Sequence, residues 1–279
     1  QTLLGKVYLT QHDYENCAIE LGDLIEQNRY QLLPKFADIF NPDNANHAES
    51  IFEIQYEKGY TGGSQWSCQA HSRDLATTLG VSTGAVTLPT ADIIEKFDTG
   101  SARYEATIGK LSGGGKMISH VKKHYMELSI QNHSDDNWPL LRYADVLLMY
   151  AESMNEQSKM TSDIWDKTIK PLRERAGFDA AYCSYPGSSD LRQVIRDERR
   201  VELALEGRRV FDLRRWALLD NPSLKSTGAA YLTTRATGAP FLDDGSNIQC
   251  QNAYNMKYWF PIPQKERDIN ANLPQNPGW

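Results

Sequence analysis

Hydrophobic residues recur at helical spacing in the first 33 positions and again from residue 140 onward. Residues 2–33 predict two helices, "TLLGKVYLT" and "DYENCAIELGDLIEQ", with Asp13 as the N-cap of the second. From Leu140, two adjacent apolar lines predict a helix that buries more than half of its circumference. The lines consist of Leu140, Tyr143, Leu147, Tyr150 and Met154, and of Leu141, Ala144, Leu148 and Ala151. The opposite face is expected to be polar, apart from Met149, and holds Arg142, Asp145, Glu152 and Glu156.

A further helical segment, "SDIWDKTIKPLRERAGF" (162–178), is expected to begin at a cap on Ser162 or Asp163 and to end at Gly177. The spacing of small and large residues in 4–18 also approximates the tetratricopeptide pattern. Together these segments predict repeated antiparallel helix pairs. The expected fold class is mainly α, an α-α superhelix of tetratricopeptide-like helix pairs with large irregular loops and minor β structure.

Two long stretches lack such periodicity. Residues 34–138 are rich in Gly, Ser, Asn, Pro and aromatic residues, and within them "SIFEIQY" (50–56) predicts one strand. We expect a single domain in four consecutive parts. These are a helix pair (1–33), a loop-rich region (34–138), a helical scaffold (139–216) and a loop-rich C-terminal segment (217–279).

Composition excludes several classes of protein. A net charge of −6 and a pI near 5.6 argue against a general nucleic-acid binder, which normally has a cationic face. No apolar run approaches the roughly 20 residues that a membrane-spanning helix needs. No signal peptide is visible at the start of the chain. The spacing of the four cysteines leaves their pairing open; they are Cys17, Cys68, Cys183 and Cys250.

Two short motifs resemble known sites without meeting their requirements. "HVKKH" (120–124) has two histidines four residues apart, but it lacks the glutamate and the third ligand of a zinc site, so it predicts surface histidines. "SGGGKMIS" (112–119) has Met117 where a phosphate-binding loop needs Ser or Thr. The sequence therefore predicts neither a metal site nor a cofactor.

Arginine is concentrated in "IRDERRVELALEGRRVFDLRRW" (195–216), which contains seven of these residues. A helix capped by Asp190 is expected to reach Glu206. Gly207 should break it before a short helix that ends at Trp216.

Glu198, Glu202 and Glu206 are spaced at i, i+4 and i+8 on that first helix. Like charges at this spacing repel, so they need cations nearby. The expected donors are close in sequence: Arg199, Arg208, Arg209, Arg214 and Arg215. Because acidic residues are interleaved with the arginines throughout, the pattern favours an internal ion network over a phosphate-binding patch or a catalytic carboxylate pair.

Four blocks in this order resemble the SusD/RagB family. They are "NWPLLRYADVLLMYAESMNE" (137–156), "LRERAGF" (172–178), "RDERRVELALEGRRVFDLRRW" (196–216) and "FPIPQKERDINANLPQNPGW" (260–279). A fifth, "LPTADIIEKFDTGSARYEAT" (88–107), resembles a segment in which family members carry Asp-x-Arg. Here Ser101 stands in place of the aspartate, two positions before Arg103, so a local ion pair of the family is expected to be missing. The resemblance covers the C-terminal part of a family member.

The resemblance implies a non-enzymatic lipoprotein at the extracellular face of a Gram-negative outer membrane. Family members bind oligosaccharides, or in some cases peptides, and lie as a lid on a SusC-type TonB-dependent transporter. Their helices form the scaffold and their loops form the ligand site. For this protein it implies a glycan ligand, a transporter partner, no nucleic-acid partner, and a lipid anchor on an N-terminal segment outside this chain.

Aromatic and hydrogen-bonding residues gather in "QYEKGYTGGSQWSCQAHSRD" (55–74), directly after the predicted strand. Sugar rings have apolar faces and polar rims, so a glycan site needs aromatic platforms with polar neighbours. The candidate ligand-binding residues are Tyr56, Tyr60, Gln65, Trp66, His71 and Arg73. The same position in the family often supplies aromatic residues that stack on ligand. The alternative is that Trp66 only packs the loop against the helices.

Two other functions stay open from the sequence alone. A tetratricopeptide-type scaffold would capture a protein partner through its helices and would have no small ligand. A glycoside hydrolase would use Glu and Asp from the loop region, although no motif for one is present.

Overall fold

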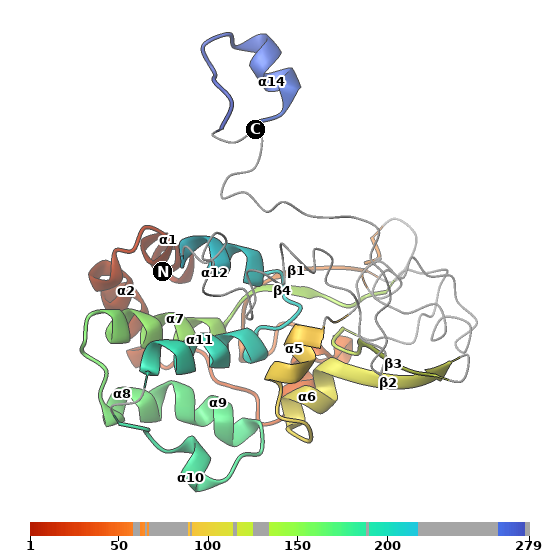
Figure 1. Ribbon diagram of the computed structural model, residues 1–279, viewed down its shortest axis with the longest axis vertical. Coiled ribbons are helices and arrows are strands. Elements are labelled where there is room, and N and C mark those ends of the chain that lie inside the picture. The colour runs from red at the N-terminus through yellow and green to blue at the C-terminus, as the bar shows by residue number, and fades with distance from the viewer. Residues whose placement is uncertain are drawn as a thin grey trace.

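The computed structural model describes residues 1–57, 62–64, 66, 89, 91–113, 116–124, 134–187, 190–216 and 262–276. The protein is mainly α, as the sequence predicts, with two small antiparallel sheets among the described residues. Figure 1 shows most of the helices gathered in one body, from which a β-hairpin extends. No helix of the described part is long and apolar enough to cross a membrane.

The first two helices form a hairpin that packs on the central helix of the body. They are α1 (Thr2–Thr10) and α2 (Tyr14–Glu26), and the central helix is α7 (Tyr143–Glu156). Asp13 caps α2 as predicted, because its carboxylate accepts the backbone N–H of Asn16. The buried core between the three helices consists of Leu9, Cys17, Leu21, Leu24, Val146 and Met149.

A second core lies on the other side of α7. It is closed by α8 (Ser162–Lys167), α9 (Ile169–Arg175) and α11 (Leu191–Glu202), with the short α10 (Ala180–Cys183) beside them. Trp165 is fully buried here, as expected for packing, and its indole N–H donates to the carbonyl of Cys183 at 2.8 Å.

The predicted helix over 162–178 differs from the observed one in two ways. It is interrupted at Thr168, which separates α8 from α9, and its cap is Thr161 rather than Ser162 or Asp163. Gly177 ends it as predicted, with φ of +91° and its N–H on the carbonyl of Glu174. This is a Schellman ending, in which a left-handed residue satisfies carbonyls that the helix leaves open.

Residues 138–142 correct the prediction for the central helix. The apolar pattern placed Leu140 and Leu141 in the helix, but they belong to strand β4 (Trp138–Arg142), which pairs antiparallel with β1 (Ser50–Ile54). Helix α7 therefore begins only at Tyr143, whose N–H donates to the carbonyl of Glu49. Strand β1 supplies the physical reason, because Leu141 and Arg142 pair with Phe52 and Ser50 and so take extended backbone.

The predicted strand 50–56 is confirmed as β1, but its exposed side is apolar. Phe52 and Ile54 are 56% and 40% exposed, whereas Glu53 between them is buried. The Glu53 carboxylate accepts the backbone N–H of Asn46 and the side-chain amide of Asn137. These two hydrogen bonds offset the cost of removing the charge from water.

The remaining helices and strands are short. Helices α5 (Ala91–Lys96) and α6 (Ala102–Thr107) precede the hairpin of β2 (Ile108–Gly113) and β3 (Lys116–Val121). Two short 3-10 helices are η1 (Phe36–Phe40) and η2 (Pro42–Asn44). The helix capped by Asp190 was predicted to reach Glu206, but α11 ends at Glu202, and Leu205 in the following turn has left-handed backbone with φ of +64°. Helix α12 (Arg209–Arg215) ends at Trp216 as predicted, and α14 (Gln264–Ile269) lies apart from the body in Figure 1.

The two histidines of 120–124 are buried, which contradicts the prediction that they are on the surface. Gly109 faces His120 across the hairpin, so close that a side chain on the glycine would meet the imidazole. His124 is 1% exposed and packs among aromatic rings. In the described part of the chain, no cluster of His, Cys, Asp or Glu could hold a metal. Cys17 and Cys183 are free, buried thiols, whereas Cys68 and Cys250 lie outside that part.

The closest approach between α1 and α2 gives a test of the packing. A Cβ on Gly5 would lie 2.5 Å from Leu21 Cδ2, and Leu21 is fully buried. We expect Gly5→Ala to lower the free energy of unfolding by about 1–3 kcal/mol, because overpacking outweighs the better helix propensity of alanine. Urea denaturation followed by circular dichroism measures the change.

Gly22→Ala in the neighbouring helix is the matched control. Its Cβ would meet Tyr150 Cε2 at 3.3 Å, and Tyr150 is only half-buried. This substitution should leave stability unchanged or raise it by up to about 1 kcal/mol. An equal loss in both variants would contradict the assignment of the close contact.

Candidate functional site

The three glutamates of the arginine-rich segment form a buried ion network, as predicted. Glu198 accepts from Arg103 and from Arg173 Nε at 2.7 Å. Glu202 accepts from Arg142 at 2.8 Å and from Arg175 at 2.6 Å.

The third glutamate and an acidic residue from the loop region complete this network. Glu206 accepts from Arg142 Nε at 2.8 Å and from Lys123 Nζ at 2.6 Å. Glu49, which precedes β1, accepts from Arg142 at 2.9 Å and from Arg175 at 2.5 Å. The guanidinium of Arg142 therefore bridges three carboxylates from two distant parts of the chain.

The predicted cation donors are corrected by this geometry. None of the arginines close in sequence pairs with Glu198, Glu202 or Glu206 in the described structure. Arg199 binds Asp145 at 2.6 Å and Asp212 at 2.9 Å instead. A glutamate that points into the body can only be reached by side chains from elements packed on that side, and these are distant in sequence.

A second network explains why the predicted polar face of α7 is buried. Asp145 and Glu152 are 1% and 3% exposed, and Arg215 pairs with both Glu152 and Asp212. Lys6 adds a further pair to Asp145 at 3.2 Å. The charged residues at helical spacing therefore lie on a buried face of α7, because each forms an ion pair with a residue of a neighbouring helix.

Buried guanidinium groups lower the pKa of the glutamates they contact. Burial alone would raise the pKa of Glu202, but the charges of Arg175 and Arg142 outweigh it and lower the pKa to about 2. The pKa of Glu206 is likewise lowered to about 2, against the effect of burial. Burial lowers the pKa of the Lys123 ammonium to about 8, partly offset by the Glu206 charge.

Arg103 lacks the local ion pair, as expected from Ser101, and pairs instead with a residue distant in sequence. Ser101 Oγ accepts the backbone N–H of Tyr104 and so caps α6. Arg103, which has no aspartate two residues before it, reaches Glu198 on α11. Ser101 therefore caps the helix, and Glu198 of the ion network pairs with Arg103.

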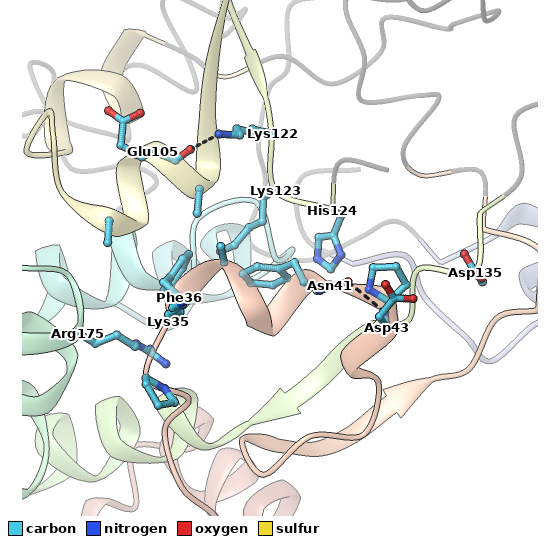
Figure 2. A pocket seen from close by; sticks show the side chains of 16 residues that line it. Lys35, Phe36, Asn41, Asp43, Glu105, Lys122, Lys123, His124, Asp135 and Arg175 are labelled. Atoms are coloured by element: carbon cyan, nitrogen blue, oxygen red, sulfur yellow. Dashed lines mark hydrogen bonds between the residues drawn. The ribbon is translucent and has the colours of Figure 1, made fainter. Parts of the chain in front are cut away.

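An open pocket of about 960 Å³ lies beside the first network. Figure 2 shows its lining, which comes from η1 and η2, α6, the end of β3, and α9. Phe36 and Phe40 form an aromatic wall, and the Lys123 ammonium lies 5.1 and 4.6 Å from their ring centroids. A cavity of this size with an apolar wall and a few polar groups is typical of ligand sites.

Aromatic rings connect this pocket with the loop predicted to bind ligand. Trp66 packs edge-on against Trp138, with ring centroids 4.9 Å apart. Trp138 stacks on His124 at 4.5 Å and an interplanar angle of 16°, and His124 in turn meets Phe40 at 4.6 Å. Asp136 fixes the imidazole through a 2.9 Å contact to Nδ1. We call Trp66, Trp138, His124 and Phe40 the aromatic row.

Only two of the six predicted ligand-binding residues fall within the described structure. Tyr56 is half-buried, and its backbone N–H donates to Asn137 Oδ1 at 2.9 Å. Trp66 is half-buried at the end of the aromatic row. Tyr60, Gln65, His71 and Arg73 lie outside the described residues.

Sequence reasoning missed the other residues of the pocket. Trp138 was not among the candidate residues, and His124 was expected on the surface, although both line up with Trp66. The available signal was the clustering of aromatic residues and prolines at 34–43 and of Trp and Pro at 138–139.

Residues 99–279 match the model of the SusD family. The chain belongs to this family. It is 26% identical to SusD-like protein P2 of Formosa agariphila over 99% of its own length and 58% of that protein. It is 23% identical to SusD-like protein P25 of the same organism, over 96% of its length and 56% of that protein. The chain thus spans less than two thirds of these curated relatives.

Solved structures of SusD-like proteins share its fold. A SusD superfamily protein of Parabacteroides distasonis has a TM-score of 0.70 at 23% identity, covering all of this chain and 62% of that one. Surface glycan-binding protein A of Bacteroides thetaiotaomicron, in complex with laminarihexaose, has a TM-score of 0.71 at 21% identity. That match covers 98% of this chain and 62% of that one.

The lowered glutamate pKa values predict how stability depends on pH. A carboxyl group whose pKa falls on folding stabilises the protein above its unfolded pKa and loses that contribution as pH falls through its folded pKa. For Glu202 and Glu206 the interval runs from 4.5 down to about 2. We expect the free energy of unfolding to drop by about 3 kcal/mol per carboxylate across it. Urea titrations at pH 7, 5, 4 and 3 measure this loss.

Two Glu→Gln variants, one in the ion network and one at an exposed position, distinguish the loss of the network from the general effect of acid on stability. Glu206→Gln should cost about 3–5 kcal/mol at pH 7, because it leaves buried cations without their partner, and should reduce the acid dependence by about half, since Glu202 still contributes. Glu174→Gln, at an exposed position, should change neither. A profile that stays flat between pH 5 and 3 in the wild-type protein would contradict the network's role.

Proposed function

We propose that this protein binds glycans without catalysis at the extracellular face of the outer membrane of a Gram-negative bacterium. In this proposal a lipid anchor outside the chain holds it there, and a SusC-type TonB-dependent transporter receives the ligand. The aromatic row carries the proposal. It connects the half-buried Trp66 to an open pocket through the rings of Trp138 and His124.

The chemistry of the aromatic row suits a sugar ring. An indole presents a flat apolar face to the C–H groups of a pyranose, and polar groups nearby can bond the hydroxyls. Trp66 rests against Trp138, so ordering it on binding has a small entropic cost. We propose Tyr56, Tyr60, Gln65, His71 and Arg73 as further ligand-binding residues of this loop. The relative crystallised with laminarihexaose, a surface glycan-binding protein by its name, supports a glycan as the ligand.

A binding role accords with the state of the buried carboxylates. A glycoside hydrolase needs one carboxylic acid that is protonated near neutral pH, which requires a raised pKa. Glu202 and Glu206 are instead held as carboxylates by arginine, with pKa values of about 2. They serve the fold, and the proposed site uses aromatic contacts. A protein-interaction scaffold is the second candidate, and it would be indifferent to changes at Trp66.

Removal of the Trp66 ring tests the proposal. We expect the wild-type protein to be retarded by one class of polysaccharide in affinity gel electrophoresis, and Trp66→Ala to lose that retardation. Loss of one stacking platform in a sugar site should weaken binding at least about tenfold, which corresponds to roughly 1.4 kcal/mol. Circular dichroism should show an unchanged fold.

Tyr182→Ala is the matched control, because Tyr182 is an exposed aromatic residue on α10 that does not line the pocket. It should keep full retardation. Retardation that persists in Trp66→Ala would move the glycan site away from this loop. No retardation on any polysaccharide would favour the scaffold, and sugar release on prolonged incubation would establish a hydrolase.

A further inference from the structure

The two buried ion networks differ in their charge balance. The second network contains three cations and three carboxylates: Lys6, Arg199 and Arg215 with Asp145, Asp212 and Glu152. The first contains five cations and four carboxylates: Arg103, Arg142, Arg173, Arg175 and Lys123 with Glu49, Glu198, Glu202 and Glu206. Counted over the described residues, the first network therefore holds one positive charge more than its carboxylates neutralise.

This excess charge faces the pocket of about 960 Å³. Of the five cations of the first network, Lys123 and Arg175 line that pocket. Three of them surround the Phe36 ring, with Lys123, Arg175 and Arg142 at 5.1, 5.3 and 6.0 Å from its centroid. A buried positive charge is costly unless a negative group lies close to it, so this wall favours an anion in the pocket.

One donor of the wall is still unused. The Arg175 side chain is only 4% exposed, and its two terminal nitrogens bind Glu49 and Glu202. Its Nε is buried and has no hydrogen-bond partner in the described structure. Lys123 is different, because its ammonium already serves Glu206 and the carbonyls of Ala204 and Glu202.

Two exposed lysines extend the positive charge to the rim. Lys35 is next to Phe36, and its ammonium makes no ion pair or hydrogen bond in the described structure. Lys122 donates to the carbonyl of Glu105 at 2.9 Å. The Glu105 carboxylate itself points away from Phe36 and Lys123 in Figure 2.

Apart from Glu105, the acidic residues of the lining lie at the opposite end. Asp43 and Asp135 are far from Arg175 in Figure 2, beyond His124. The pocket therefore has a cationic end, around Phe36, and an acidic end. The aromatic row reaches this pocket through His124, two ring contacts away from Trp66.

We propose that the cationic end of this pocket is a subsite for an acidic sugar, one that carries a carboxylate or a sulfate ester, within the same glycan that stacks on Trp66. This inference rests on the proposed function and adds the ligand class. Phe36 offers an apolar wall for the ring, and Lys35 and Lys122 reach the anionic group from the rim. Arg175 and Lys123 lie behind the Phe36 ring and add positive electrostatic potential to this end of the pocket. They attract the anionic group, because opposite charges attract strongly where water is excluded.

The test compares an oligogalacturonate with its carboxyl-reduced form of the same length, by isothermal titration calorimetry on the 279-residue chain. We expect the acidic form to bind about tenfold more tightly at low salt, and the difference to shrink as salt screens the charges. Lys35→Gln should remove a threefold or larger part of that difference and leave binding of the reduced form unchanged. Lys167→Gln, an exposed lysine of α8 outside the pocket, should have no effect.

The outcomes separate this inference from the proposed function. Equal binding of the two forms, or a preference that Lys35→Gln leaves intact, would overturn the acidic subsite, even if polysaccharides still retard the protein in the gel. Inorganic sulfate alone binding as tightly as the oligogalacturonate would assign the pocket to a free anion and overturn the sugar subsite. Failure of every polysaccharide in the gel would instead remove the proposed function itself.

Discussion

The bridge from Arg142 to Glu49, Glu202 and Glu206 is the interaction on which the rest of the structure depends. It joins β4, the segment before β1, and the end of α11, all in a region with almost no exposure to water. Removing one partner from such a network leaves a buried charge unpaired, which costs about 3–5 kcal/mol. The elements are therefore stable only together, and the loop region is tied to the helices by charge as well as by apolar packing.

Local features of the fold were predictable because their causes are local. Asp13 and Asp190 cap their helices through side chains that reach only three residues ahead, and Gly177 takes left-handed backbone that other residues avoid. The strand at 138–142 was not predictable from periodicity. An apolar run that continues into a helix looks helical throughout, and only its partner strand β1, far away in sequence, shows otherwise.

The cation partners in the ion network were also not predictable from sequence spacing. Spacing placed Glu198 and Glu202 on one line, which is correct, and it required cations, which are present. It could not show that these cations come from α6, β4 and α9, because a search among sequence neighbours favours the arginines of the same segment. The site is similar. Trp66 stood out by its surroundings in sequence, whereas Trp138 and His124 became its neighbours only through the tertiary fold.

The first ion network also holds part of the pocket wall in place. Phe36 is held between Lys123, Arg175 and Arg142, so the wall of the pocket is fixed before any ligand arrives. A preorganised wall lowers the entropic cost of binding, and loops above it can then vary without loss of the scaffold. The same ions that hold the elements together leave one positive charge at the pocket. A change in the charge of the ligand would therefore change the electrostatic energy of the first ion network. Ligand specificity and protein stability would be coupled at this pocket.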